Sequence, residues 1–241
     1  MPILESAIVI VQARLGSTRL PRKVLETLPK RGTILNEVLQ RSRQIGAMSV
    51  VLSCPYGEAF ELQGAYNNVG IDVREGPHPD LLTCYAQIAQ EFGASYIVRI
   101  TSDCPLMDPL FARLVLQRCI HEDIFDDGMA YAHNTRPGVD GLDAEAFTIG
   151  ALLKAYEIVE SDDDRHHVTQ AMRDGKVDGC KIVHVPQAVK YEKRCPDLSV
   201  DTAEDLARVR SVFEHIEPGD CSWYSTLQAC RKAGLIAEEV Q

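Results

Sequence analysis

The sequence predicts an α/β protein with a mostly parallel central sheet and helices on both of its faces. Short apolar runs alternate along the chain with amphipathic segments whose apolar residues recur at helical spacing. The first apolar run, residues 7–11 (AIVIV), contains no polar residue, as expected of a strand that is covered on both faces. Alternation of this kind is typical of parallel strands joined by helices.

The first half of the chain shows this alternation most clearly. Its sequence predicts strands at residues 7–11, 49–53, 71–73 and 96–100. It also predicts a helix that begins at Ile34 and is ended by Gly46, a second from residue 58 to about 68, and a third over residues 80–92. Asp80 is the expected N-cap of the third helix, because its side chain can accept from the free backbone N–H groups there.

The second half is less regular. It predicts strands at residues 129–132, 144–148, 182–185 and 198–200, and helices at residues 150–159, 164–173, 202–215 and 222–233. Neither a low-complexity linker nor an internal repeat separates the two halves. We therefore expect a single domain over residues 1–241, with an inserted hairpin near residues 129–148.

Composition narrows the range of partners and locations. The net charge of −10 argues against nucleic acid or an anionic membrane as the main partner. No apolar stretch reaches the roughly 20 residues that span a bilayer, and the N-terminus shows no signal-peptide pattern. Eight cysteines without a C-x-x-C pair predict reduced thiols of a cytoplasmic protein, with Cys104 as a small buried filler.

The charges are unevenly distributed along the chain. Residues 12–43 hold eight Lys or Arg and two Glu, whereas residues 121–164 hold twelve Asp or Glu and two Lys or Arg. A basic segment inside an acidic chain suggests a local anion site, although a solvated charged surface is the commoner cause of such a run.

Four of the cations lie in the loop VQARLGSTRLPRKVL (residues 11–25), which follows the first predicted strand. Ligands bind beyond the carboxyl ends of strands in open parallel sheets, so this position suits a ligand site. Gly16 allows close backbone approach, and Arg14, Arg19 and Lys23 suit a phosphate chain. The loop matches neither the Walker A nor the dinucleotide-binding pattern, and composition alone leaves a plain basic turn equally open.

Two aspartates follow predicted strands. Asp103 comes after residues 96–100, and Asp201 comes after residues 198–200. A Mg²⁺ ion takes one or two protein carboxylates together with phosphate oxygens and water, so this pair suits Mg²⁺ held against a nucleotide. The alternative is that either aspartate caps a helix, and for Asp201 this alternative is strong because DTAED is a good helix start.

The loop closely resembles the nucleotide-binding loop of cytidylyltransferases that make CMP-activated acidic sugars. It is most similar to the SpsF branch, which is related to the acylneuraminate and KDO cytidylyltransferases. That branch usually has QAR-x-GSTRLPGKVL, so Arg22 stands here where a glycine is usual. The resemblance continues to about residue 215, through VRITSDCPLMDP (98–109), DGLDAEAF (140–147), RHHVTQAMR (165–173) and LSVDTAEDLARVR (198–210).

The resemblance implies a Rossmann-like nucleotidyltransferase fold that is related to the GT-A glycosyltransferases. It implies a Mg²⁺-dependent transfer of CMP from CTP to a hydroxyl of a small acceptor, an acidic sugar for surface polysaccharide, with release of pyrophosphate. In this reaction Arg14, Lys23 and Asp103 are catalytic, while Asp103 and Asp201 hold the metal. The expected partners are CTP and the acceptor, without nucleic acid or membrane, and a homodimer is expected.

The nucleotide-binding residues are expected mainly in the first loop. Asp80 belongs to residues 74–80, which follow a predicted strand end where they can contact the base or the ribose, although Pro77 and Pro79 leave a stiff turn equally open. The predicted set is Gln12, Ala13, Arg14, Gly16, Ser17, Arg19, Lys23 and Asp80.

Acceptor contacts are expected in the acidic stretch. Asp140, Asp143 and Glu145 suit hydroxyls or an amino group, although a solvated acidic loop is equally open. His166 and His167 are adjacent and so point in different directions, which favours a single substrate contact, assigned to His167, over a shared metal. The SpsF branch usually has Glu where His166 stands, and this difference leaves the choice of acceptor open.

Two other functions remain open. A GT-A-like glycosyltransferase would use a nucleotide-sugar donor and commonly holds its metal with a D-x-D motif, but residues 102–105 here are SDCP, with Asp103 alone. A non-catalytic nucleotide-binding protein would keep the loop and lose turnover, and the retained Asp103 and Asp201 speak against it.

Overall fold

A seven-stranded sheet forms the centre of the computed structural model, which describes residues 6–66, 70–125, 128–135, 139–187 and 195–236. The strand order is β5-β4-β1-β6-β8-β7-β9. The strands are β1 (Ala7–Gln12), β4 (Ser49–Pro55), β5 (Asp72–Gly76), β6 (Tyr96–Thr101), β7 (Ala130–His133), β8 (Glu145–Thr148) and β9 (Lys181–His184). Only β8 runs antiparallel to its neighbours β6 and β7, and the other pairs are parallel. The prediction of a mostly parallel sheet is thus confirmed.

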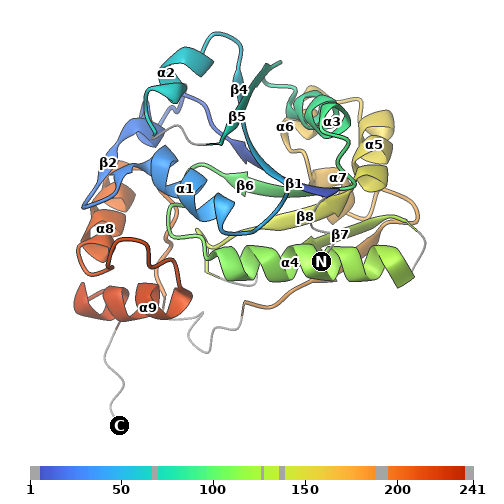
Figure 1. Ribbon diagram of the computed structural model, residues 1–241. Coiled ribbons are helices and arrows are strands. Elements are labelled where there is room, and N and C mark those ends of the chain that lie inside the picture. The colour runs from blue at the N-terminus through green and yellow to red at the C-terminus, as the bar shows by residue number, and fades with distance from the viewer. Residues whose placement is uncertain (1–5, 67–69, 126–127, 136–138, 188–194, 237–241) are drawn as a thin grey trace.

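Helices cover both faces of this sheet, as predicted (Figure 1). Along β1, Val9 and Val11 pack into one core, while Ile8 and Ile10 pack into the other, because successive side chains of a strand point to opposite faces. The first core contains residues of α1 (Ile34–Arg43), α4 (Pro109–Phe125), α8 (Ala203–Phe213) and α9 (Trp223–Lys232). The second contains residues of α3 (Leu81–Glu91), α5 (Ile149–Ile158) and α7 (Gln170–Arg173).

The longest helix, α4, was not predicted from the sequence. Its buried side includes Val115, Leu116 and Cys119, but Leu110 and Leu114 are exposed on the opposite side. Apolar residues therefore surround the helix, and the one-sided apolar stripe on which the prediction of helices depends is missing.

Two predicted helices differ from the structure. The helix expected to reach about residue 68 ends early, since α2 spans Ala59–Gln63 with Gly64 as its C-cap, and residues 67–69 lie outside the described part of the chain. The helix expected over residues 164–173 is divided into α6 (Asp162–His166) and α7. His167 between them has φ −102° and ψ 79°, which no α-helix allows.

Residues 198–200, which the structure describes, form a loop and not the predicted strand. The N–H of Leu198 donates to the carbonyl of Asp140, and the N–H of Val200 donates to the carbonyl of Asp103, each at 2.8 Å. Gly141 allows this close approach, because a Cβ there would lie 2.3 Å from the carbonyl carbon of Leu198. The segment is thus held by loops beyond the strand ends and not by a strand ladder.

Two further findings concern the whole described chain. No helix of the described residues has both the length and the apolar character that crossing a membrane demands. The eight cysteines all lie within the described residues and are unpaired, and Cys104 is buried as predicted.

Candidate active site

The first loop leaves the carboxyl end of β1 and closes on itself at its base. The N–H groups of Ser17 and Arg22 both donate to the carbonyl of Leu15 at 3.0 Å, and the N–H of Leu15 donates to Glu58 Oε2 at 2.7 Å. A Cβ placed on Gly16 would meet no described atom within 4 Å. Packing within the chain therefore does not demand a glycine here, and ligand approach remains its expected role.

The backbone conformation of Arg22 explains why related loops usually have a glycine at this position. It has φ 61° and ψ 24°, the left-handed conformation that favours glycine, directly before the short helix η2 (Lys23–Leu25). Its guanidinium pairs with Glu61. The loop thus keeps a glycine-type backbone although an arginine occupies the position, and the glycine preference reflects conformation.

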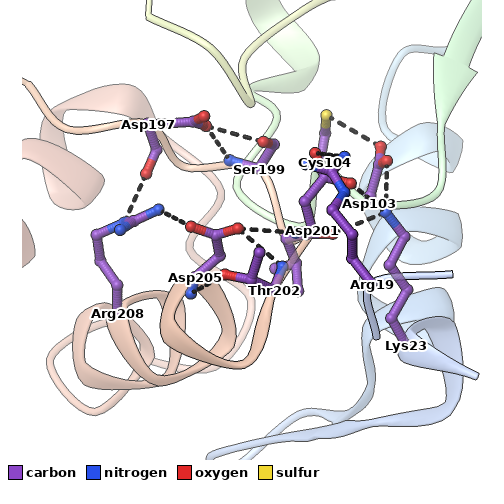
Figure 2. A network of polar contacts seen from close by, with 11 residues as sticks. Arg19, Lys23, Asp103, Cys104, Asp197, Ser199, Asp201, Thr202, Asp205 and Arg208 are labelled. Atoms are coloured by element: carbon purple, nitrogen blue, oxygen red, sulfur yellow. Dashed lines mark hydrogen bonds and ion pairs between the residues drawn. The ribbon is translucent and has the colours of Figure 1, made fainter. Parts of the chain in front are cut away.

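Lys23 lies at the centre of a charged cluster (Figure 2). Its Nζ donates to Asp103 Oδ2 and Asp201 Oδ1 at 2.9 Å each, and to the carbonyl oxygen of Val200 at 2.8 Å. Arg19 Nη2 lies 2.9 Å from the other oxygen of Asp201. The first loop, the end of β6 and the loop before α8 therefore meet at one ammonium group.

Burial and charge act against each other in this cluster. Burial alone would lower the pKa of Lys23, but the two carboxylates outweigh it and raise that pKa above its usual value. Burial would likewise raise the pKa of Asp103, and the Lys23 ammonium outweighs it and lowers that pKa. Both groups are therefore charged at neutral pH.

Asp201 reaches this cluster from a capped helix start. The Thr202 hydroxyl accepts from the N–H of Asp205, and the Asp205 carboxylate accepts from the N–H groups of Thr202 and Asp201. Arg208 pairs with Asp205 and donates to the carbonyl of Asp197 at 2.8 Å (Figure 2). Thr202 and Asp205 perform the capping, which leaves the Asp201 carboxylate for the two cations.

A cavity of about 240 Å³ opens beside this cluster. Its lining includes most of the predicted nucleotide-binding set, from Gln12 through Arg14 to Lys23, together with both metal candidates. The full lining is Gln12, Ala13, Arg14, Ser17, Thr18, Arg19, Lys23, Val24, Arg99, Thr101, Ser102, Asp103, His166, His167 and Asp201. We call it the loop cavity.

Two residues of the predicted set are not part of this lining, as far as the described residues define it: Gly16 and Asp80. Asp80 instead caps α3, since its carboxylate accepts from the N–H of Thr83 at 3.1 Å and pairs with Arg165 Nε at 3.0 Å. The capping role predicted for Asp80 is confirmed, and its carboxylate is committed to the protein.

A second cavity of about 390 Å³ adjoins the first and shares Arg99 and Thr101 with it. Its other lining residues are His133, Thr135, Asp140, Asp143, Ala144, Glu145 and Arg173. We call it the acidic cavity. The three predicted acceptor carboxylates thus lie together here, whereas His167 lies in the loop cavity.

Glu145 holds the wall of the acidic cavity together and is only 1 % exposed. Its carboxylate accepts from Arg99 Nη1 and Tyr131 OH at 2.5 Å, from Arg173 Nη2 at 2.6 Å and from Thr169 Oγ1 at 2.8 Å. Burial would raise the pKa of Glu145, but the two arginines lower it to about 2. Glu145 therefore holds the cavity wall together. Because its carboxylate is bonded to these four side chains, we assign it this structural role in place of the predicted contact with the acceptor.

Asp140 and Asp143 face the acidic cavity as a pair. Burial, a hydrogen bond with Asp140 and the charges of Asp140 and Glu145 raise the pKa of Asp143 to about 8. Asp143 is therefore mostly protonated at neutral pH. The pair can both donate to and accept from a hydroxyl or amino group.

Histidines line the rim of the loop cavity. Arg14 Nη1 donates to His78 Nε2 at 3.2 Å, and the His78 and His166 rings meet edge to face at 5.4 Å. His166 Nδ1 lies 3.1 Å from the carbonyl oxygen of Pro79 and donates a hydrogen bond to it. The adjacent His167 is exposed, and its ring meets that of His166 edge to face at 5.3 Å, so the prediction that the two side chains point in different directions is wrong.

The cluster suits a divalent cation. Within the described residues, no group of three or more His, Cys, Asp or Glu side chains surrounds one position. Two carboxylate oxygens and one carbonyl oxygen nevertheless converge on Lys23 Nζ. All three are hard oxygen donors, and Mg²⁺ needs few protein ligands when phosphate and water supply the rest.

Sequence reasoning missed Arg99, Thr101 and Arg173. Arg99 and Thr101 are polar residues in the otherwise apolar strand YIVRIT, and this interruption was the available signal. Arg173 ends the motif RHHVTQAMR, but its contact with Glu145 depends on the break between α6 and α7.

The chain is similar to several known proteins. A family model described as cytidylyltransferase matches residues 8–176, more than two thirds of the chain. The chain is 25% identical over 221 residues to the spore coat polysaccharide biosynthesis protein SpsF of Bacillus subtilis, with 88% of each chain covered.

Two solved structures show the same fold. A cytidylyltransferase from Leptospira borgpetersenii has a TM-score of 0.82 at 24% identity and covers 98% of this chain and 99% of its own. A CMP:2-keto-3-deoxy-manno-octonic acid synthetase complexed with CTP has a TM-score of 0.60 at 16% identity, covering 87% and 99%. At these identities the likeness supports the fold alone.

Proposed function

The chain belongs to the cytidylyltransferase family of nucleotidyltransferases, and we propose on this basis that it transfers CMP from CTP to a hydroxyl of a small acidic sugar. The observation that carries the proposal is the cluster of Lys23, Asp103 and Asp201 beside a cavity lined by the first loop. The SpsF name of one relative suggests a product for surface polysaccharide.

The reaction joins an acceptor hydroxyl to the α-phosphorus of CTP. The hydroxyl oxygen forms the new bond to that phosphorus, the bond from the α-phosphorus to the bridging oxygen breaks, and pyrophosphate leaves with the electron pair. The hydroxyl proton is released to water. Charge grows on the phosphate oxygens during transfer, so fixed cations stabilise the transition state more than the ground state.

The residues of the loop cavity supply those cations. Arg14 and Arg19 are exposed at its mouth and Lys23 lies at its floor, with a side chain only 11% exposed. We assign these residues to the triphosphate, together with Gln12, Ala13, Gly16 and Ser17 of the same loop. Mg²⁺, when held by Asp103 and Asp201, supplies further positive charge for the phosphates and lowers the pKa of the attacking hydroxyl.

The acidic cavity is our proposed acceptor site. It meets the loop cavity at Arg99 and Thr101, so a molecule bound there lies next to a nucleotide in the first loop. Asp140 and Asp143 are the proposed contacts to its hydroxyl or amino groups, and His167 contacts it from the loop cavity.

We also propose an oligomeric state, a cellular compartment and a domain organisation for the protein. We propose a homodimer in a reducing, cytoplasmic compartment, in keeping with eight unpaired cysteines. We also propose one domain over residues 1–241, in which β7 and β8 form the antiparallel part of the common sheet.

A panel experiment tests the proposed function. The protein is incubated with Mg²⁺, each of the four nucleoside triphosphates in turn, and sugar acids alongside neutral hexoses, and pyrophosphate release is followed. We expect release with CTP and a sugar acid, well above that with UTP, ATP or GTP. Sugar transfer from a nucleotide sugar, or binding of CTP without turnover of any acceptor, would contradict the proposal.

A further inference from the structure

The ammonium of Lys23 lies where a metal ion would have to lie. Two carboxylate oxygens and the Val200 carbonyl oxygen surround its Nζ at 2.8–2.9 Å, and they come from the end of β6 and the loop before α8. These are the same oxygens that suit Mg²⁺. Figure 2 shows the Lys23 side chain reaching upward from the first loop into the space between Asp103 and Asp201.

We propose that Lys23 is the internal counter-ion of the metal site, which it occupies until the phosphates of a nucleotide draw it away. The inference rests on the proposed function, because it takes Asp103 and Asp201 as the metal ligands. It adds that metal and nucleotide bind cooperatively through a single side chain that exchanges partners.

The ammonium and the metal exclude each other from this position. Mg²⁺ binds its oxygen ligands at about 2.0–2.1 Å and demands near-octahedral geometry. An ammonium that remains within hydrogen-bond distance of the same oxygens would overlap the ion and repel its charge. Binding of the metal therefore requires Lys23 to leave Asp103 and Asp201.

A new partner for Lys23 lies within reach of its flexible stem. The side chain lines the loop cavity together with Arg14, Ser17 and Arg19, where the triphosphate is proposed to bind. A phosphate there replaces the two carboxylates as acceptors for the ammonium, while the metal replaces the ammonium between the carboxylates. Each ligand thus lowers the cost of binding the other.

This exchange predicts opposite effects of one substitution on two ligands. Lys23→Met removes a cation from the phosphates, so CTP binds more weakly. The same change leaves two close carboxylates without their internal cation, so a divalent ion binds them more tightly. A lysine that served only the phosphates would weaken CTP binding and leave the metal affinity unchanged.

The test measures Mn²⁺ binding by calorimetry, without nucleotide, in the wild type and in Lys23→Met. We expect at least about tenfold tighter binding in the variant, within the usual range of coupling between sites. Lys23→Gln serves as a second variant, and circular dichroism checks the fold of each. Mn²⁺ should also raise the melting temperature of both variants more than that of the wild type.

Lys176→Met is a matched control. Lys176 also lies between two carboxylates, those of Asp164 and Asp174, but on the surface and outside both cavities as the described residues define them. Its loss should leave Mn²⁺ binding unchanged. Adding Asp103→Asn to Lys23→Met should abolish the tighter binding and so locate it at this cluster.

Wild-type protein provides an independent measurement, with a CTP analogue whose α–β bridge is a methylene group so that no transfer occurs. We expect Mn²⁺ to bind at least about tenfold more tightly with the analogue than without it. Mn²⁺ binding to the nucleotide-free wild type as tight as to Lys23→Met, or as tight as with the analogue, would overturn the inference.

The outcome is separable from that of the proposed function. The Mn²⁺ titrations of nucleotide-free protein involve neither CTP nor an acceptor. A protein that fails to release pyrophosphate in the panel refutes the proposed function, whereas unchanged Mn²⁺ affinity in both Lys23 variants refutes the counter-ion alone.

Discussion

The cations of the first loop form one basic run in the sequence, but each has different surroundings in the structure. Lys23 points into the protein, where it meets two carboxylates, whereas Arg14 and Arg19 are exposed at the cavity mouth. Arg22 turns away to pair with Glu61 on α2. The sequence places the four cations in one loop, but it holds no information on which of them would face the aspartates.

Arg22→Gly should stabilise the protein by about 0.5–1 kcal/mol. A left-handed conformation costs a non-glycine residue about 1–2 kcal/mol, and the greater freedom of glycine in the unfolded chain offsets part of that gain. Urea unfolding measures the difference. Arg22→Ala is the control, since it also loses the Glu61 pair but keeps a Cβ in this conformation. Equal stability of the two variants would show that the backbone here is not strained.

Asp143→Asn should stabilise the protein increasingly as pH rises above about 4, with the full gain above pH 8. The pKa of Asp143 is raised from 3.8 to about 8, so the unfolded chain ionises first, and folding stability falls as pH rises between these values. Above pH 8 the variant should be more stable by at least about 1.4 kcal/mol, the value of one pKa unit. Thermal unfolding at pH 4 and pH 9 measures this, with the exposed Asp178→Asn as control. A gain of the same size at both pH values would exclude this cause.

Helices and strands with a clear apolar pattern or a capping residue were predicted well. Segments whose apolar residues follow no such pattern were not. The continuous apolar run of β1 and the capped helix α3 match their predicted positions within a residue. Helix α4 was not predicted because apolar residues surround it. Residues 198–200 have the apolar character of a strand, but loop carbonyls and the Asp197 carboxylate accept from their N–H groups. Such tertiary contacts leave no periodic trace in the sequence.

Glu145→Gln should destabilise the protein by about 3–5 kcal/mol, because β8 and α7 are joined through this carboxylate and Arg99 would lose its buried counter-charge. Chemical unfolding at pH 7 measures the loss. Glu157→Gln, which breaks an exposed pair with Lys154, should stay within about 0.5 kcal/mol. A similar small effect of both changes would refute the anchoring role.

The lowered pKa of the Glu145 carboxylate predicts how the stability of the protein depends on pH. Its folded pKa of about 2 lies below its usual value of 4.5, so its contribution to stability is complete above pH 4.5 and is lost as pH falls towards 2. The stability of the wild type should therefore fall more steeply over this range than that of Glu145→Gln. Parallel curves for the two proteins would contradict the lowered pKa.

At the scale of the whole molecule, the sheet brings together residues that lie far apart in the sequence. Lys23 follows β1, Asp103 follows β6, and Asp201 lies almost a hundred residues further along. Because parallel strands end at one edge, the position of Asp103 could be predicted. The position of Asp201 was predicted for a wrong reason, since a loop and not a strand delivers it. The adjoining acidic cavity depends on Arg99 and Arg173, which only the folded chain reveals.

The most direct test of the central claim, CMP transfer at the cluster of Lys23, Asp103 and Asp201, is the turnover of Asp103→Asn. CTP labelled at the α-phosphorus is supplied with Mg²⁺ and the best acceptor of the panel, and label joined to the acceptor is counted. We predict a loss of at least about 100-fold with the fold intact by circular dichroism, since removal of a group that stabilises transferring charge costs about this much. Adding Asp201→Asn should lower turnover little further, because residues that act as one unit are not additive. A folded Asp103→Asn protein that transfers label at the wild-type rate in limiting Mg²⁺ would contradict the account.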